Sequence, residues 1–462
     1  MACSLKQVFT LGKIGLVGLI FTFASACAST SKDPKTKVTF EKEIKIADNG
    51  LYFDGKKVKK SDLNQEKYDY FFGARITPHG DCIKVYNGFV FMTWYRGGKN
   101  DRHVMLSRYN PSTGVIKTIE FPHRHTGFLN QPEIGESHNT IAIGIAPVDG
   151  TIHLLYDMHA YSEHRPTDGS FSEDYFRYSY SVKQAASVAD DEFTLDLFVN
   201  SEKGHYKHLE MRKGVDYRSL TYPNFYNNKL GELFMWIREG GNNNGAYKFA
   251  KYDGKEWGEF TQFNILNAKQ KGLEYNWGLY GDIKFESGKM RIGFQSRSSN
   301  NNDKYKYNNG VFYGYSDDPS GKEQWKDYQG KEFTLPLIQY EKIRVSEPGD
   351  TVKSHGKNSV VIANGFDWTV TDRGDIHFVS AVKGKTERKS VHTYKSSTDK
   401  DFFISTEFPG GKLYTYNNQV YIIGLHKGLI YVEQAEGGTN DFKRVYTADK
   451  NGKKFRHGNV YI

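Results

Sequence analysis

Cysteine is scarce in this sequence, with three among 462 residues. Cys3 and Cys27 lie in an N-terminal stretch that is typical of a leader, so Cys82 would be the single cysteine of the mature chain. One cysteine cannot form an intramolecular disulfide. A zinc site built from several thiolates is excluded for the same reason.

Histidines and carboxylates would therefore have to hold any metal, and their spacing favours none. The pairs His123/His125 and His153/Asp157 are the candidates, but their spacing is weak and the motif His-x-x-x-His is missing. Ordinary strand or surface histidines are the favoured interpretation. We predict no metal site and no cofactor.

Long hydrophobic runs are also lacking. The N-terminal apolar stretch Ile14–Ala24 is too short to span a bilayer as a helix. Lys6 and Lys13 precede it, and a basic start followed by a short apolar core is typical of a secretory signal peptide. The sequence thus predicts an exported protein.

The end of this leader resembles the lipobox at which bacterial lipoproteins are cut and acylated, because the small residues Ala-Ser-Ala directly precede Cys27. We predict a signal peptide over residues 1–27, lipidation of Cys27 and a polar tether over residues 28–40. The protein would be lipid-anchored at the bacterial cell envelope, at the outer membrane or cell surface, or secreted. The alternative is an ordinary cleavage site with an incidental cysteine.

Helical periodicity is nearly absent, whereas short runs of alternating aromatic and β-branched residues recur between turns. The clearest six runs begin after Gly88, Gly150, Gly231, Gly288, Gly374 and Asn417. One repeated strand pattern, with 15% aromatic residues to fill wedge-shaped space, favours an all-β, seven-bladed β-propeller as a single domain over residues 41–462. The segment Ser316–Trp325 looks like a degenerate Asp-box turn of sialidase-type propellers.

Charge of one sign is in modest excess: 63 basic against 54 acidic residues give a net charge of +9. The excess is spread along the chain, which favours a broadly positive surface that attracts polyanions. An exported protein meets acidic polysaccharide more often than nucleic acid. We therefore expect a polysaccharide partner, no nucleic acid, and a monomer; a solubility feature is the alternative explanation.

Two histidines mark the first candidate site. His138 precedes one predicted strand and His159 follows the next, with a turn at Pro147–Gly150 between the strands. An antiparallel hairpin brings these two ends to the same rim, so both rings can face one cavity. His153 lies within the second strand instead.

A second hairpin carries Tyr222 before one predicted strand and Arg238 at the far end of the next, followed by a Gly/Asn-rich loop. The same geometry brings these two side chains together, beside the blade that holds the histidines. Taken alone, Tyr222 is one of 32 tyrosines and Arg238 is a surface cation.

The segments HNTIAIGIAPVDGTIHLLYDMH, TYPNF and WIREGGNNNGAYKFAKYD resemble the BNR-type propeller lyases of polysaccharide lyase families 24 and 25. These enzymes cleave ulvan, a sulfated rhamnose–uronate polysaccharide, by β-elimination. The resemblance implies that His138, His159, Tyr222 and Arg238 form the site. Asn139, Asn244 and Arg297 complete the substrate-binding set that we predict.

β-Elimination at a uronate needs a group that neutralises the carboxylate, a base and an acid, and these residue types can supply all three. An arginine can neutralise the carboxylate and so stabilise the enolate-like intermediate, which assigns charge neutralisation to Arg238. His138 is the candidate base for the C5 proton and Tyr222 the candidate acid for O4, although the two could exchange roles. His159 would bind or orient the substrate.

Two other functions compete with the lyase. A sialidase-like glycoside hydrolase would use a cluster of Arg96, Arg238 and Arg297, but the sequence provides no evident acid pair. A noncatalytic glycan-binding lipoprotein is the third hypothesis. It would have no need to keep His138 and Tyr222.

Overall fold

The computed structural model describes most of the chain after residue 37. The described residues are 38–59, 66–77, 81–129, 131–156, 159, 177–200, 211–212, 220–300, 302–352, 361–384 and 386–455. Contacts divide the chain into a unit of residues 1–36 and a unit of residues 37–462, and all described residues belong to the second. The predicted signal peptide, Cys27 and most of the tether lie outside them. Among the described residues, none of the helices has the length and apolarity needed to cross a membrane.

Antiparallel meanders make up the described unit, and the first three carry the N-terminal half. The first contains β2 (Ile83–Tyr86), β3 (Phe89–Tyr95), β4 (His103–Tyr109) and β5 (Ile116–Arg124). The second contains β7 (Ile141–Ile145), β8 (Ile152–Tyr156) and β9 (Tyr178–Tyr180). The third contains β10 (Leu220–Asn227), β11 (Leu233–Gly241), β12 (Asn244–Tyr252) and β13 (Thr261–Gln262).

The C-terminal half repeats the arrangement. The fourth meander contains β14 (Trp277–Glu286), β15 (Lys289–Ser298), β16 (Asn308–Ser316), β17 (Trp325–Lys326), β18 (Glu332–Phe333) and β19 (Arg344–Ser346). The fifth contains β20 (Val361–Val370), β21 (Ile376–Lys383), β22 (Arg388–Lys395) and β23 (Phe403–Ser405). The sixth contains β24 (Leu413–Tyr416), β25 (Gln419–His426), β26 (Leu429–Glu436) and β27 (Lys443–Thr447).

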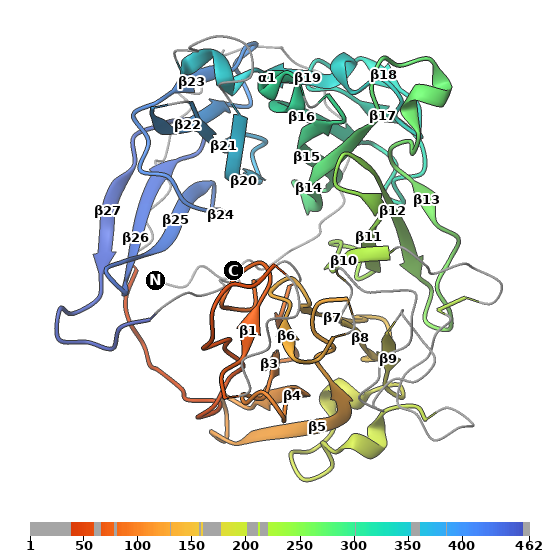
Figure 1. The fold of residues 1–462 in the computed structure, drawn as a ribbon, viewed down its shortest axis with the longest axis vertical. Coiled ribbons are helices and arrows are strands. Elements are labelled where there is room, and N and C mark those ends of the chain that lie inside the picture. The colour runs from red at the N-terminus through yellow and green to blue at the C-terminus, as the bar shows by residue number, and fades with distance from the viewer. Residues whose placement is uncertain are drawn as a thin grey trace, which may run out of the picture. The chain divides into compact units, whose positions relative to one another are not determined.

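Short elements complete the unit. A small parallel sheet pairs β1 (Asp69–Tyr70) with β6 (Ile134–Gly135). The helices are α1 (Lys304–Tyr307) and the single-turn 3-10 segments η1 (Ala185–Ser187), η2 (Leu195–Leu197), η3 (Ala268–Lys271), η4 (Tyr340–Ile343) and η5 (Pro348–Thr351). Within the unit, the meanders follow one another around a common centre in chain order (Figure 1).

The third and fourth meanders are joined only by one bridge, between Gly245 of β12 and Gly278 of β14, so we count them separately. The described residues then contain seven sheet units: the six meanders and the β1–β6 pair. The all-β propeller predicted from the sequence is confirmed, and the seven sheet units agree with the predicted seven blades. The six repeated runs are β3, β8, β11, β15, β21 and β25, the second strand of each meander. A turn residue with a positive φ stands one or two residues before each of these strands: Gly88, Gly150, Gly231, Gly288, Gly374 and Asn417.

The Asp-box-like segment forms a closed turn between β16 and β17. The Asp318 carboxylate accepts backbone N–H bonds from Ser320, Lys322 and Glu323, and the Trp325 indole N–H donates to the Gly321 carbonyl at 2.7 Å. Trp325 is 1% exposed. The turn therefore anchors a buried indole in the fourth meander and plays a structural role.

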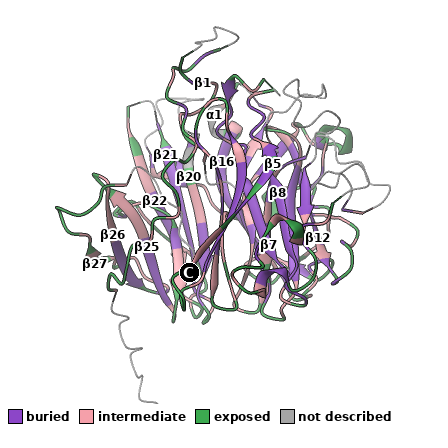
Figure 2. Ribbon diagram, turned by 90° about the horizontal axis from the view of Figure 1, so that it is seen from below, coloured by how far each residue is buried: buried purple, intermediate pink, exposed green. Residues whose placement is uncertain are grey.

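The core lies between meanders as well as within them. Figure 2 shows the strands largely buried, with exposed residues on the connecting turns. The second and third meanders, which carry the candidate histidines and the candidate Tyr/Arg pair, meet where Gly144 of β7 lies against Phe225 of β10. A Cβ on Gly144 would stand 2.6 Å from Cγ of Phe225. This close approach holds the two halves of the site together.

Gly144→Ala should therefore destabilise the fold, because Phe225 cannot move its own ring root away from the new methyl group. We expect the free energy of unfolding to fall by about 1–3 kcal/mol in a denaturant titration, the usual cost of overpacking. Gly50→Ala is the matched control, because nothing lies within 4 Å of a Cβ there. Equal stability of both variants and the wild type would contradict this packing.

Candidate active site

The two histidines predicted as a pair do meet. His138 lies three residues before β7 and His159 three residues after β8, and these strands pair from Ile141 with Tyr156 onward. The ring centroids of His138 and His159 are 4.5 Å apart. Their side chains are 21% and 15% exposed, so each ring has one edge open and the rest packed.

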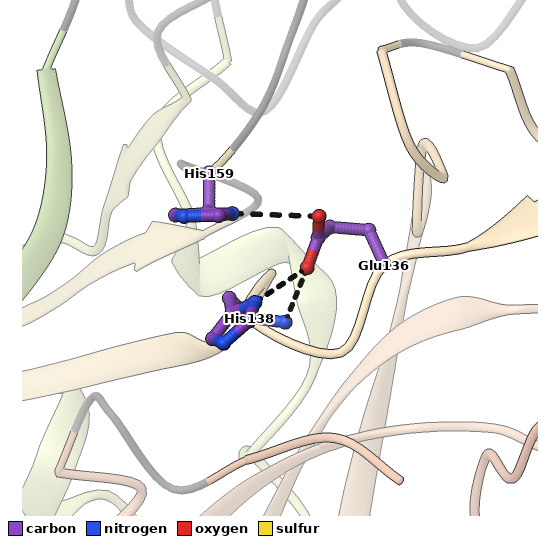
Figure 3. A group of neighbouring side chains, drawn as sticks. All are labelled: Glu136, His138 and His159. Carbon is purple, nitrogen blue, oxygen red and sulfur yellow. Dashed lines mark hydrogen bonds and ion pairs between the residues drawn. The ribbon is translucent and has the colours of Figure 1, made fainter. Parts of the chain in front are cut away.

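Glu136 joins the two histidines, and it is not among the residues predicted from the sequence. Its Oε1 accepts the backbone N–H and the Nδ1–H of His138, both at 2.8 Å, and its Oε2 lies 3.4 Å from Nδ1 of His159 (Figure 3). Burial alone would raise the pKa of this carboxyl, but the bonds from His138 and His159 outweigh it and lower the pKa to about 2. The carboxylate is thus ionised, fully buried and shared.

Buried polar groups fix the backbone around Glu136 and His159. His125 donates from Nε2 to the Glu136 carbonyl at 2.8 Å and accepts the Gly127 N–H at Nδ1. Asn139 is fully buried, and its amide accepts the His159 N–H at 3.0 Å and donates to the Gly127 carbonyl at 3.3 Å. The predicted substrate contact Asn139 therefore lies behind the site, where it fixes the backbone of His159.

Tyr222 approaches the histidines from β10 on a distorted stretch of strand. Its φ is 54°, and the register with β11 shifts between Thr221 and Asn224, as at a β-bulge. The Tyr222 ring stacks on His159 with centroids 5.0 Å apart. Burial raises the pKa of its phenol to about 12, against the opposing effect of the Arg238 cation, so Tyr222 keeps its proton at neutral pH.

Arg238 belongs to β11 and pairs with Thr221 of β10. Its guanidinium carbon lies 4.5 Å from the Tyr222 ring centroid. The residue is 5% exposed. Among the described residues, nothing accepts a hydrogen bond from its Nε or Nη1. Buried donors without acceptors are costly and rare. The two unused N–H groups can donate to an anionic group.

The cationic surface continues onto the fourth meander. Tyr280 of β14 lies between the two arginines: its ring centroid is 5.4 Å from the Arg238 guanidinium and 4.1 Å from that of Arg297. Arg297 also donates to the Tyr280 hydroxyl at 3.3 Å. Sequence reasoning found Arg297 but not Tyr280, because one tyrosine in an aromatic-rich strand carries no signal of its own.

The remaining predicted residues lie elsewhere or have other partners. Asn244 is tied to Asn267 through two hydrogen bonds of 2.8 and 2.9 Å across the Gly/Asn loop. Arg96 is paired with Asp101 and Glu120 on the first meander. Of the three arginines of the hydrolase hypothesis, Arg238 and Arg297 share Tyr280, whereas Arg96 is bound by its own carboxylates.

The metal candidates from the sequence also have other partners. His125 holds Glu136 in place, and His153 is fully buried with Nδ1 2.6 Å from the Tyr178 hydroxyl. Asp157 lies outside the described residues. In the part of the chain that the structure describes, Glu136, His138 and His159 are the one group of three whose possible ligand atoms lie within 4.8 Å of one another. Contacts among its own members account for this grouping.

Comparison with known proteins identifies the family of the chain. The model of the BNR repeat-containing family matches residues 89–406. The short isoform of ulvan lyase from Alteromonas sp. (strain LOR) is 48% identical over 451 residues, covering 92% of this chain and 85% of that protein. The chain belongs to the ulvan lyase family. The crystal structure of the polysaccharide lyase Uly1 aligns with a TM-score of 0.88 at 46% identity, covering 92% of this chain and 94% of that one.

Longer members of the ulvan lyase family also match. The long isoform from Alteromonas sp is 50% identical over 449 residues, which cover 92% of this chain but 45% of that protein. The chain thus spans about half the length of the long relatives.

Proposed function

We propose that this protein is an ulvan lyase that cleaves the polysaccharide at its uronate residues by β-elimination. The observation that carries the proposal is the buried Arg238 guanidinium with two unused N–H donors, beside a carboxylate-bound histidine pair and a protonated tyrosine. A uronate carboxylate matches the fork of such a guanidinium, and its C5 proton needs a base nearby. The relatives named above support the same activity.

Arg238 would perform the first task, which is to neutralise the substrate carboxylate. Loss of the C5 proton places a second negative charge on this group, and the carboxylate resists it. A bidentate guanidinium in a buried site stabilises that charge far more than it could in water. Arg297, on the far side of Tyr280, extends the cationic surface toward a neighbouring anionic group of the sulfated chain.

The proton transfers fall to His138 and Tyr222. His138 would take the C5 proton through Nε2, since its Nδ1–H is bound by Glu136. The electrons of the C5–H bond then form the C4–C5 double bond, and the C4–O4 bond breaks. The raised pKa of Tyr222 keeps its phenol protonated, which favours Tyr222 as the acid that donates a proton to O4. His159, stacked on Tyr222, would orient the substrate.

The reaction itself provides the first test, since elimination creates a double bond and hydrolysis does not. We expect incubation of the soluble mature domain with ulvan to raise the ultraviolet absorbance, in step with new chain ends, in the presence of a chelator. The chelator is included because each proposed step uses a side chain. New reducing ends without a gain in absorbance would refute the lyase.

Single substitutions should separate proton transfer from binding. His138→Ala and Tyr222→Phe should lower turnover by about two to four orders of magnitude, the usual contribution of a positioned acid or base, while oligosaccharide affinity is retained. The matched controls His426→Ala and Tyr416→Phe change exposed residues and should leave turnover unchanged. Near-wild-type turnover in both site variants would place the chemistry elsewhere.

Substitution of Arg238 should lower both binding and turnover, because its guanidinium would contact the substrate carboxylate both before and during the reaction. Arg238→Ala should weaken oligosaccharide binding as well as turnover. Arg238→Lys should not restore either, because an ammonium lacks the fork geometry. Initial rates and binding affinities of the folded variants check this, and full rescue by lysine would contradict a bidentate contact.

We also propose that the protein is exported as a monomer and anchored through lipid on Cys27. Acyl chains supply membrane affinity, so Cys27→Ser should move the protein from the membrane to a soluble or unprocessed form. Metabolic labelling with a fatty-acid analogue measures this, with Cys82→Ser as the control that stays labelled. Equal labelling of wild type and Cys27→Ser would contradict the anchor.

A further inference from the structure

Glu136 is the buried charge that the proposed reaction does not yet use. It touches no solvent, and both of its oxygens face imidazole Nδ1 atoms: Oε1 that of His138 at 2.8 Å, and Oε2 that of His159 at 3.4 Å. A carboxylate accepts hydrogen bonds and cannot donate them. His138 must therefore turn a protonated Nδ1 toward Oε1. Oε2 and the His159 Nδ1 have no hydrogen-bond partner among the described residues, and a proton on that Nδ1 would serve both atoms.

The other ring nitrogen follows from this constraint. A neutral imidazole carries one proton, so a proton on Nδ1 leaves Nε2 with a lone pair on the far side of the ring. A lone pair on Nε2 then points away from the buried carboxylate in each ring. Phe72 packs edge-on against both rings, with centroids 4.8 Å from His138 and 5.6 Å from His159, so an apolar wall limits their rotation.

Glu136 is itself held rigidly. Its carbonyl accepts from His125, and its Oε1 accepts the backbone N–H of His138 as well as the side chain. Asn139 fixes the backbone of His159 at the same time. Buried networks of this kind orient the groups that perform chemistry.

We propose that Glu136 is a positioning residue that sets the tautomer of both histidines, so that His138 and His159 each present a basic Nε2 to the substrate. The inference deepens the proposed function and rests on it for its kinetic part. Its structural part concerns the free protein and can be tested without any substrate.

Glu136→Gln gives a sharp test, because a carboxamide offers one acceptor and one donor where the carboxylate offers two acceptors. Only one histidine can then keep its Nδ1–H facing residue 136. The other must change tautomer and accept the amide N–H at Nδ1, which moves its proton to Nε2. We expect nitrogen NMR of histidine-labelled protein at pH 8 to show both rings as Nδ1–H in the wild type and one ring switched in the variant.

Kinetics supply the second readout. Turnover of Glu136→Gln should fall by about 100-fold or more, as expected when a base presents the wrong tautomer, while the affinity for an ulvan oligosaccharide changes little. The acid limb of the rate profile should move to lower pH, because loss of the anion disfavours the imidazolium. The other groups that face the pair, Tyr222 and Arg238, are unchanged in this variant.

Two further variants keep the test decisive. Glu133→Gln makes the same change at an exposed carboxylate on the other side of β6 and should leave both readouts at wild-type values. Glu136→Asp keeps two acceptor oxygens, so it should retain both Nδ1–H tautomers and more activity than Glu136→Gln. Thermal unfolding of each variant confirms that the fold is intact.

The outcomes separate the two claims. If the wild type eliminates ulvan but Glu136→Gln is equally active, or both rings remain Nδ1–H in that variant, the positioning role is wrong and the lyase stands. If the wild type lacks lyase activity while the tautomers switch as stated, the orientation of the pair stands and its proposed use fails. An aspartate variant that behaves like the glutamine variant would also overturn the inference.

Discussion

A buried guanidinium with unused donors is the interaction on which the site depends. Arg238 is 5% exposed, and its Nε and Nη1 have no acceptor among the described residues. Such a group is stable only because the surrounding strands hold it there, with Tyr222 on one side and Tyr280 on another. In the proposed reaction the substrate carboxylate would accept from these donors and so offset the cost of burying the cation.

The rest of the site forms a chain of contacts away from this cation. Tyr222 links Arg238 to His159, and His159 links to Glu136, which in turn holds His138. The Arg238 cation lies at one end of this chain of contacts, and the Glu136 anion lies between the two histidines. The groups come from adjacent meanders, and the contact of Gly144 with Phe225 sets how closely those meanders approach.

The sequence predicted what depends on strand periodicity and hairpin geometry. Six repeated runs led to the propeller, and the ends of two hairpins led to His138, His159, Tyr222 and Arg238. It did not predict what depends on side-chain burial. Glu136 stands two residues before His138 in a polar stretch that resembles a solvated loop, and nothing in its spacing tells that its carboxylate turns inward. Asn139 is predicted to bind substrate because it stands next to His138 in the segment that resembles the lyase families, but its amide is buried and bonded to the backbone.

The origin of the oxygen in the products tests the central claim most directly, because elimination breaks the C4–O4 bond without adding water. The measurement is mass spectrometry of ulvan oligosaccharides released in water enriched in the heavy oxygen isotope. The account predicts products that carry no label and have lost the elements of water at the uronyl end. One labelled oxygen for each bond cleaved would mean hydrolysis, and it would contradict the assignment of Arg238, His138 and Tyr222 to β-elimination.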